Sequence, residues 1–289
     1  MSESLVYLNG EYLPLSKAQI SVLDRGFLFG DGVYEVIPAY GGHPFRLTQH
    51  LDRLDNSLKG IRVKQPYTHK QWSEILDRLL RDKSGDDYSI YLQVTRGAAA
   101  GRDHAFPADI EPTVFVMVSP IPALKPEKVK KGISTITLED SRWQQCDIKS
   151  ITLLANVLLK QQANDQGADE AILIREGEAT EGSASNLFIV KDGVITTPPK
   201  SHHLLPGITR DLVLELAADA GMANSEASIA ESELQSADEI WMTSSTKEVM
   251  AVTTLNGKPV GGGVPGPVWQ EMIGLYQSCK ERLRTGADC

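Results

Sequence analysis

Apolar and polar residues alternate in short runs along the first 120 residues, as expected for strands with one buried face. Asn9-Gly10 stands between two of these runs, and this dipeptide favours the tight turn of a β-hairpin. Gly41-Gly42 predicts a second turn. The strands predicted in this half are 5–8, 11–13, 33–40, 43–47, 88–95 and 113–119.

Two helices are predicted between these strands from apolar residues that recur at helical spacing. The first has an N-cap at Thr48 and ends at Gly60. The second begins with a capping box at residues 68–71. Their predicted buried residues are Leu51, Leu54, Leu58, Trp72, Ile75, Leu76 and Leu79.

The second half of the chain follows a proline-rich stretch, residues 120–126, and mixes strand and helix patterns. The predicted strands follow one another in hairpins and not as regular βαβ units, so the chain is expected to be an α+β protein. We expect a smaller N-terminal domain over 1–120, a linker over 121–127 and a larger domain over 128–289. The elements predicted in this half are strands 133–138, 170–175, 187–191, 240–244 and 249–254, and helices 153–166, 209–220 and 268–283.

Composition narrows the possible partners. The 289 residues are 41% hydrophobic and 23% charged, which is ordinary for a globular protein. A net charge of −9 argues against a nucleic-acid surface, which would need a basic patch. The longest stretch without charge, 112–124, holds three prolines and is too short to span a membrane. Neither a nucleic acid nor a membrane is therefore an expected partner.

The three cysteines, Cys146, Cys279 and Cys289, are odd in number and widely spaced, without a Cys-x-x-Cys pair. A framework of disulfides is therefore not expected, and a reducing compartment is favoured. The N-terminal residues lack the basic and apolar regions of a signal peptide. These features together predict the cytoplasm.

Two sequence patterns have simple explanations. Residues 261–266 fit the spacing G-x-G-x-x-G, but a dinucleotide site would need a βαβ unit and an acidic residue about 20 positions on, and the chain ends soon afterwards. A turn into the last helix is expected there. His202-His203 lacks the further ligands that zinc requires, so no metal site is predicted.

Lys149 and Glu181, 32 residues apart, carry the chemistry of greatest interest. A lysine amine can form a Schiff base with a carbonyl cofactor of the pyridoxal type. An anion beside the pyridine nitrogen keeps that ring protonated, so that it can accept electrons. From the residues alone, Lys149 could equally be a surface lysine, and Glu181 could cap a turn among small polar residues.

A second set of residues offers a place for an anion. Gly207-Ile208-Thr209 opens a predicted helix, whose free N–H groups and dipole attract negative charge. An ordinary threonine N-cap is the simpler explanation, and the two are compatible. Ser244-Ser245 would add hydroxyl and amide donors.

Four motifs, found in this order, carry a resemblance to a known family. They are GDGVYEV at 30–36, HLDRL at 50–54, EGSASN at 181–186 and LPGITR at 205–210. The chain resembles fold type IV aminotransferases that depend on pyridoxal phosphate, the class IV aminotransferase family, and within it the D-amino acid aminotransferases. The resemblance extends from residue 7 to the Ser244-Ser245 region, nearly the whole chain.

This resemblance implies a two-domain α+β fold with the active site between the domains, and pyridoxal 5'-phosphate as cofactor. It implies that Lys149 is the catalytic Schiff-base lysine, that Glu181 pairs with the ring nitrogen, and that Arg53 holds the phosphate. From periodicity alone, Arg53 would be a charge on the helix surface. The cofactor-binding residues implied are Arg53, Lys149, Glu181, Ser185, Asn186, Leu205, Gly207, Ile208, Thr209, Ser244 and Ser245. The family often has glycine and threonine where this chain has Ser244-Ser245, and Ala184 replaces a serine common in the D-specific members.

The resemblance also implies how substrate is bound. Arg102 and His104, with Tyr34, would hold the α-carboxylate, for which the arginine fork is suited. Val36 is a further implied substrate contact. In the family this loop enters the site of the neighbouring subunit, so a homodimer is expected.

The implied reaction is the exchange of an amino group between a D-amino acid, such as D-alanine, and a 2-oxo acid, such as 2-oxoglutarate. Three alternatives stay open: a branched-chain L-amino acid aminotransferase, a lyase acting on aminodeoxychorismate, and a non-catalytic dimeric binding protein that kept the fold. The branched-chain and lyase relatives lack the Arg-x-His element of residues 102–104.

Overall fold

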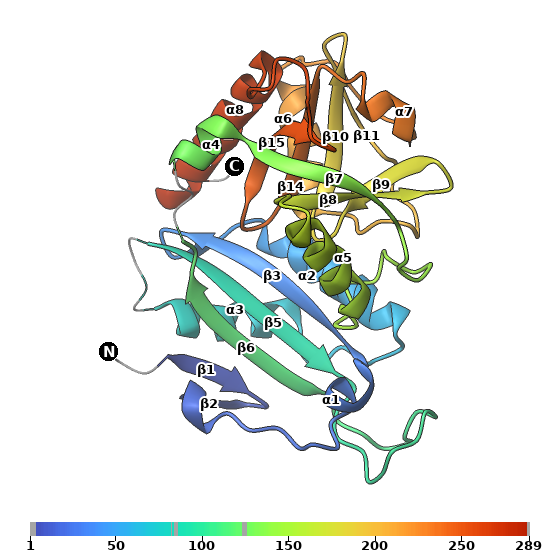
Figure 1. The fold of residues 1–289 in the computed structure, drawn as a ribbon. Helices are drawn as coiled ribbons and strands as arrows, with labels where there is room; N and C mark the ends of the chain where they lie inside the picture. The colour runs from blue at the N-terminus through green and yellow to red at the C-terminus, as the bar shows by residue number, and fades with distance from the viewer. Residues whose placement is uncertain (1–3, 82, 84–85, 123–125, 288–289) are drawn as a thin grey trace. The chain divides into compact units, whose positions relative to one another are not determined.

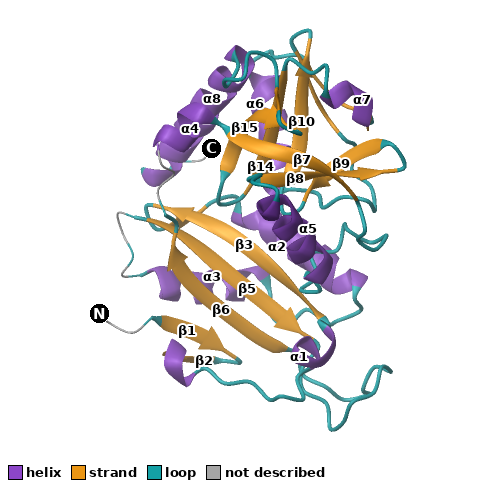
Figure 2. Cartoon of the chain, in the orientation of Figure 1, coloured by secondary structure: helices purple, strands orange, loops and turns teal. Residues whose placement is uncertain are grey.

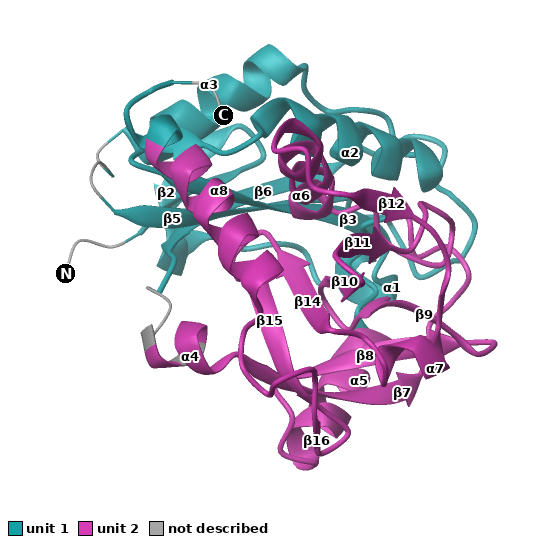
Figure 3. Cartoon of the chain, turned by 90° about the horizontal axis from the view of Figure 1, so that it is seen from above, with its two compact units in different colours: residues 1–122, 148–153, 282–288 teal, residues 123–147, 154–281, 289 magenta. Residues whose placement is uncertain are grey.

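The computed structural model describes residues 4–81, 83, 86–122 and 126–287. The chain divides into two compact units, coloured separately in Figure 3. The first comprises Met1–Pro122, Ile148–Leu153 and Arg282–Asp288, and the second comprises Ala123–Asp147, Leu154–Glu281 and Cys289. The predicted domains did not anticipate that 148–153 and 282–288 return to the first unit. Part of the predicted linker, 123–125, lies outside the described residues.

A six-stranded antiparallel sheet forms the first unit (Figure 2). Its order is β2-β1-β6-β5-β3-β4, with long central strands that pair over their whole length. Asn9 and Gly10 have positive φ, as the predicted turn between the first two strands requires. The strands are β1 Leu5–Leu8, β2 Glu11–Pro14, β3 Gly32–Tyr40, β4 His43–Pro44, β5 Asp87–Thr95 and β6 Thr113–Pro120. A 3-10 turn, η1, covers Leu15–Lys17, and the short helix α1 covers Arg25–Phe29.

Helices α2 (Leu47–Gly60) and α3 (His69–Leu80) cover one face of this sheet (Figure 1). The predicted inward-facing leucines of α2 and the Trp72 side of α3 form the core with β3, β5 and β6. The capping box of α3 is confirmed: the Gln71 N–H donates to the Thr68 hydroxyl, and the Thr68 N–H donates to the side-chain oxygen of Gln71. The predicted cap at Thr48 is wrong: Arg46, in the left-handed region, is the N-cap, and its side chain makes no capping bond.

The second unit contains a mixed sheet of ten strands in the order β12-β11-β10-β14-β15-β7-β8-β9-β13, with β16 beside β15. The predicted succession of hairpins does not hold for β7 and β8, which are parallel and are connected through helix α5. The α+β class is confirmed. The strands are β7 Ile133–Glu139, β8 Glu170–Arg175, β9 Glu178–Gly182, β10 Asn186–Lys191, β11 Val194–Thr197, β12 Asn224–Glu226, β13 Ile229–Ala230, β14 Glu239–Ser244, β15 Glu248–Leu255 and β16 Lys258–Pro259.

Helices α4 to α8 begin in the second unit, and apolar residues of its strands and helices form two core clusters. The glycine-rich stretch 261–266 is the loop before the last helix, as predicted. The helices are α4 Pro126–Lys131, α5 Leu154–Asp165, α6 Ile208–Asp219, α7 Glu231–Leu234 and α8 Pro267–Arg284.

Cys146 is a buried free thiol, whereas Cys279 is disulfide-bonded. One disulfide is not a framework of bridges, but it gives no support to the expected reducing compartment. Among the described residues no helix is both long and apolar enough to cross a membrane. His202 and His203 are exposed, and Nδ1 of His202 lies 3.1 Å from the Asp147 carboxylate.

Candidate active site

Lys149 is held by the first unit. Its carbonyl accepts from the Tyr34 N–H at 3.0 Å, and its own N–H donates to the buried Ser57 hydroxyl at 3.2 Å. The segment 148–153 therefore runs beside β3, and the Lys149 ammonium lies 4.3 Å from the centre of the Tyr34 ring. Lys149 and Tyr34, assigned different roles from the sequence, are thus neighbours.

A buried cluster on the opposite side of β3 holds Arg53. Its guanidinium donates two parallel hydrogen bonds of 2.8 Å to the Glu35 carboxylate, and His50 Nδ1 lies 2.7 Å from the same group. Arg53 is 6% exposed, so the helix-surface position indicated by periodicity is wrong. Its partners Glu35 and His50 were not predicted from the sequence. The available signal was an acidic residue in the inward phase of β3, between Val33 and Ile37.

Charge in this cluster is fixed by its pairing. Burial alone would raise the pKa of Glu35, but Arg53 and His50 outweigh it and hold the pKa below its usual range. Burial, with the nearby charges of Arg53 and Lys149, lowers the pKa of His50 although Glu35 raises it. Glu35 is therefore an anion, and His50 is neutral near pH 7.

Glu181 lies at the end of β9 in the second unit and is 4% exposed. The expectation of a turn is wrong for this residue, since its neighbours pair with β8. Three groups contact its carboxylate: Arg142 donates at 2.5 Å, the Leu205 N–H at 3.1 Å and the Asn186 amide at 3.2 Å. These contacts fix the orientation of the carboxylate.

Arg142 forms ion pairs with two acids, Glu181 and Asp140. It donates twice to Asp140 at 2.9 Å in addition to its bond with Glu181, and Arg175 also pairs with Asp140 at 3.0 Å. Burial raises the pKa of Glu181 to about 7, and Arg142 and the Leu205 N–H offset that only in part. Arg142 was missed from the sequence, because nothing in local spacing connects it with a residue 39 positions away.

The N-terminus of α6 has the properties of an anion site. Gly207 is the N-cap and has no side chain to bond the first amides, so the alternative of a Thr209 cap is wrong. A Cβ atom at Gly207 would lie 1.8 Å from the Asn186 amide oxygen, so glycine is required here. Asn186 also donates to the Leu205 carbonyl at 2.8 Å, which connects the loop to the Glu181 cluster.

Hydroxyl groups near these residues have the donor chemistry that a phosphorylated cofactor needs. The Ser185 and Thr243 hydroxyls are buried and have no hydrogen-bond partner in the described part of the chain. Ser244 and Ser245 follow Thr243 at the turn between β14 and β15 and are half-buried. Unpaired hydroxyls, the amides at the start of α6 and a buried carboxylate suit a ligand with an anionic phosphate and a ring N–H. The residues present therefore fit pyridoxal phosphate.

The predicted substrate residues belong to two places in the first unit. Tyr34 and Val36 alternate with Glu35 on β3, so they lie on the sheet face opposite the Arg53 cluster and are half-buried. Arg102 and His104 are exposed on a loop without regular secondary structure, and both lie against the Phe29 ring.

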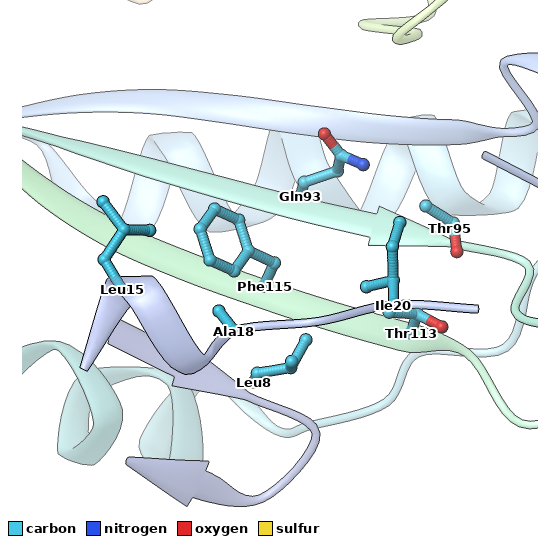
Figure 4. Close-up of a pocket in the computed structure, with 8 residues that line it drawn as sticks. All are labelled: Leu8, Leu15, Ala18, Ile20, Gln93, Thr95, Thr113 and Phe115. Carbon is cyan, nitrogen blue, oxygen red and sulfur yellow. The ribbon is translucent and has the colours of Figure 1, made fainter. Parts of the chain in front are cut away.

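A separate cavity of about 220 Å³ lies in the first unit, where residues 15–20 pass over β5 and β6 (Figure 4). None of the predicted site residues line it. Its lining residues are Leu8, Leu15, Ala18, Ile20, Gln93, Thr95, Thr113 and Phe115.

Comparisons with known proteins agree with the predicted family. Residues 32–255 match the family Amino-transferase class IV. A D-alanine aminotransferase of Bacillus licheniformis is 42% identical over 94% of this chain and 96% of its own length. A second, from Staphylococcus haemolyticus, is 37% identical over 92% of this chain and 94% of its own.

Similar solved structures include branched-chain amino acid aminotransferases. One from T.th., solved with pyridoxamine 5'-phosphate, has a TM-score of 0.89 and 32% identity, over 97% of this chain and 95% of its own. The Escherichia coli enzyme has a TM-score of 0.86 and 27% identity, over 100% and 96% of the two chains. The fold class, the aminotransferase activity and the pyridoxal phosphate cofactor predicted from the sequence are confirmed, and the chain belongs to the class IV aminotransferase family.

Proposed function

We propose that this enzyme transfers an amino group between a D-amino acid, such as D-alanine, and a 2-oxo acid, such as 2-oxoglutarate. The observation that carries the proposal is the buried Glu181 carboxylate, oriented by Arg142, Asn186 and the Leu205 N–H. The D-alanine aminotransferases that match almost the whole chain support the D-amino acid as substrate.

Pyridoxal phosphate, when bound, supplies a protonated ring that accepts electrons from the bond to be broken. Lys149 is proposed to join the cofactor and to act on the substrate. Its neutral amine accepts the Cα proton of the amino acid and later donates it, which is general acid–base catalysis by one group. The bonds from its backbone to Tyr34 and Ser57 fix the segment from which the side chain extends.

Glu181 is proposed to accept a hydrogen bond from the ring nitrogen. A carboxylate with a pKa raised to about 7 holds a proton more tightly than an ordinary glutamate, so it is a strong acceptor for that N–H. The cation of the ring would favour the anionic carboxylate.

The phosphate is proposed to bind at the N-terminus of α6 and to Arg53. The amides of Ile208 and Thr209 and the hydroxyls of Ser244 and Ser245 are the donors of the second unit. Leu205, Gly207, Ser185 and Asn186 would surround the cofactor. The Glu35 carboxylate accepts from Nε and one terminal nitrogen along one edge of the Arg53 guanidinium and so sets its direction.

We propose that Arg102 and His104, with Tyr34, hold the substrate carboxylate, and that Val36 contacts the substrate. Both enantiomers must present the Cα–H bond to Lys149, so their carboxylates and side chains exchange places. The side that carries the cationic residues therefore selects the D-amino acid.

A homodimer is proposed, in which the loop 102–104 serves the neighbouring subunit. Exposed apolar residues support this assembly, because such surfaces usually mark interfaces. Val22 and Phe27 are each 68% exposed in the first unit. In the second unit, Leu154, Val157 and Leu158 form an apolar stripe along α5, at 70%, 59% and 60% exposure. A cytoplasmic location is likewise proposed.

Branched-chain L-amino acid transamination is the second candidate, since the T.th. structure named for that activity is 32% identical. One experiment separates the two. Purified enzyme is incubated with 2-oxoglutarate and either D-alanine or L-leucine, and the products are resolved by chiral chromatography. We expect pyruvate from D-alanine; preferential use of L-leucine would replace the first proposal by the second.

A further inference from the structure

Arg25 is a buried residue that the proposed reaction does not use. It begins α1 and is 3% exposed. The preceding residue, Asp24, is also buried, and its carboxylate accepts from the Gly26 N–H and from the hydroxyls of Thr95 and Thr113. These bonds attach the start of α1 to the ends of β5 and β6, so the Arg25 side chain extends from a fixed backbone.

The Arg25 guanidinium connects two segments. Its Nε donates to Asp31 at 2.8 Å, directly before β3 begins. Its terminal nitrogens donate to the carbonyls of Asp103, His104 and Ala105 at 2.5, 3.2 and 3.4 Å. Three consecutive carbonyls of an exposed loop therefore depend on one buried cation.

Asp31 is itself held firmly. Arg96 donates to both of its oxygens, at 2.7 and 2.9 Å, and also to the Ile61 carbonyl at 2.8 Å. Arg25 thus bonds to a carboxylate whose orientation is fixed, and this restricts the position of the Arg25 guanidinium. Lysine could keep the charge at this place, but it lacks the planar set of five donors that reaches an acid and three carbonyls together.

Phe29, four residues after Arg25, contacts the side chains of Arg102 and His104. The Arg25 and Arg102 guanidinium carbons lie 4.8 and 4.9 Å from its ring centre, and the His104 ring centre lies 5.2 Å away. Cations over an aromatic face are attracted to it, so Phe29 gives Arg102 a preferred direction.

We propose that Arg25 is a positioning residue for recognition of the substrate carboxylate: it fixes the loop that carries Arg102 and His104, and Phe29 orients their side chains. This inference rests on the carboxylate-binding role proposed above for that loop. It predicts that Arg25 affects every substrate with an α-carboxylate, whether amino acid or oxo acid.

The test compares Arg25→Lys with the parent in steady-state and single-turnover assays. The KM for D-alanine and for 2-oxoglutarate should both rise by roughly tenfold to a hundredfold, the effect expected from losing a charge-assisted hydrogen bond. The cofactor absorbance and its dissociation constant should not change, and kcat should fall less than KM rises. If Arg25→Lys has the KM of the parent while Arg102→Ala raises KM, the inference about Arg25 is overturned and the proposed carboxylate site is retained.

A double-mutant cycle excludes a merely structural effect. If Arg25 acts through the loop, Arg25→Lys should raise KM no further in a chain that already carries Arg102→Ala and His104→Ala. Equal effects in both backgrounds would overturn the inference. If Arg102→Ala leaves KM unchanged, the proposed carboxylate site is wrong and the inference is lost with it.

Matched variants complete the test. Arg284→Lys is the control, because Arg284 also pairs with an acid, Asp87, and lies near an aromatic ring, Tyr40, within the first unit, away from the contacts that hold the loop. Its KM should equal that of the parent.

A second variant, Phe29→Leu, applies should Arg25→Lys fail to fold. It removes the aromatic ring while leaving the Arg25 bonds intact, and a KM increase of severalfold is expected. No increase in KM would overturn the role of Phe29.

Discussion

Glu35 and Glu181 are both buried beside an arginine, yet their pKa values move in opposite directions. Glu35 receives two bonds from Arg53 and one contact from His50, and its pKa is lowered. Glu181 receives one bond from an arginine that binds Asp140 as well, and its pKa is raised to about 7. The presence of an ion pair therefore does not fix the charge of a buried acid; the share of the cation that it receives does.

The two carboxylates therefore differ in role: one holds an arginine in place, and the other is proposed to take part in the chemistry. Glu35 is a permanent anion that orients Arg53. Glu181 keeps an affinity for protons, which suits an acid that faces a ring nitrogen.

The largest expected effect concerns Lys149, the proposed catalytic lysine. Lys149→Ala removes the proposed proton carrier, so turnover of D-alanine should fall below detection in a chiral product assay. Borohydride treatment of the parent should attach the cofactor to Lys149, as identified by mass spectrometry. Lys59→Ala, an exposed lysine of the same unit, is the control and should be as active as the parent. An adduct on a different lysine would reject the assignment.

Glu35→Leu should have the largest effect on stability. It leaves the buried Arg53 charge without its partner, and breaking a buried pair in this way costs about 3–5 kcal/mol in free energy of unfolding. Urea unfolding at pH 7 and fixed protein concentration measures it. A loss below about 1 kcal/mol would show that Arg53 does not depend on Glu35.

Glu181→Gln should slow the chemistry while changing stability less than Glu35→Leu does. Losing a hydrogen bond to a charged group, worth about 1.5–3 kcal/mol, corresponds to a rate roughly 10- to 150-fold lower. Single-turnover absorbance changes with D-alanine measure the rate. Glutamine keeps the shape of glutamate and one of its two acceptor oxygens, so either Arg142 or the Leu205 N–H, which bond to different oxygens, retains its acceptor, and the fold should persist. An unchanged rate would contradict the proposed contact with the ring nitrogen.

The smallest expected effect is a dependence of stability on pH, opposite in sign for the two acids. The pKa of Glu181 rises on folding from 4.5 to about 7, so the folded chain binds its proton more tightly. Its contribution to stability is complete below pH 4.5 and is lost progressively as pH rises to 7. Glu181→Gln should remove this slope from pH-dependent urea unfolding.

Glu35 provides the opposite sign in the same measurement. Its pKa falls on folding, so its contribution is present above pH 4.5 and is lost as pH falls below that value. Glu35→Gln should reduce the acid sensitivity of the chain. Parallel pH profiles for both variants would refute the contrast between the two acids.

Local rules predicted those parts of the fold that local contacts determine. The Asn9-Gly10 turn and the Thr68–Gln71 capping box each depend on residues within four positions, and both were found. The cap at Thr48 failed because the left-handed Arg46 starts the helix earlier. Strand β9 was missed because its pairing with β8 and β13 outweighs a sequence of small polar residues.

The site was predicted in part for the same reason. Resemblance identified Arg53 and Glu181 but not the groups that pair with them. His50 lies on α2 only three residues before Arg53, whereas Glu35 and Arg142 are 18 and 39 residues away from the partners they contact. Only folding brings Arg142 to Glu181, since no periodic pattern extends over 39 residues. The buried position of Arg53 also contradicts its place outside the apolar stripe of α2.

The segment 148–153 has a consequence for how such a chain could evolve. The chain passes from the first unit to the second after Pro122, returns for Ile148–Leu153, leaves again, and comes back at Arg282. A single cut or gene fusion cannot exchange either unit as a module, because a fragment ending at Pro122 would lack the stretch that carries Lys149. Recombination between relatives is therefore expected to preserve the two units as one inherited whole.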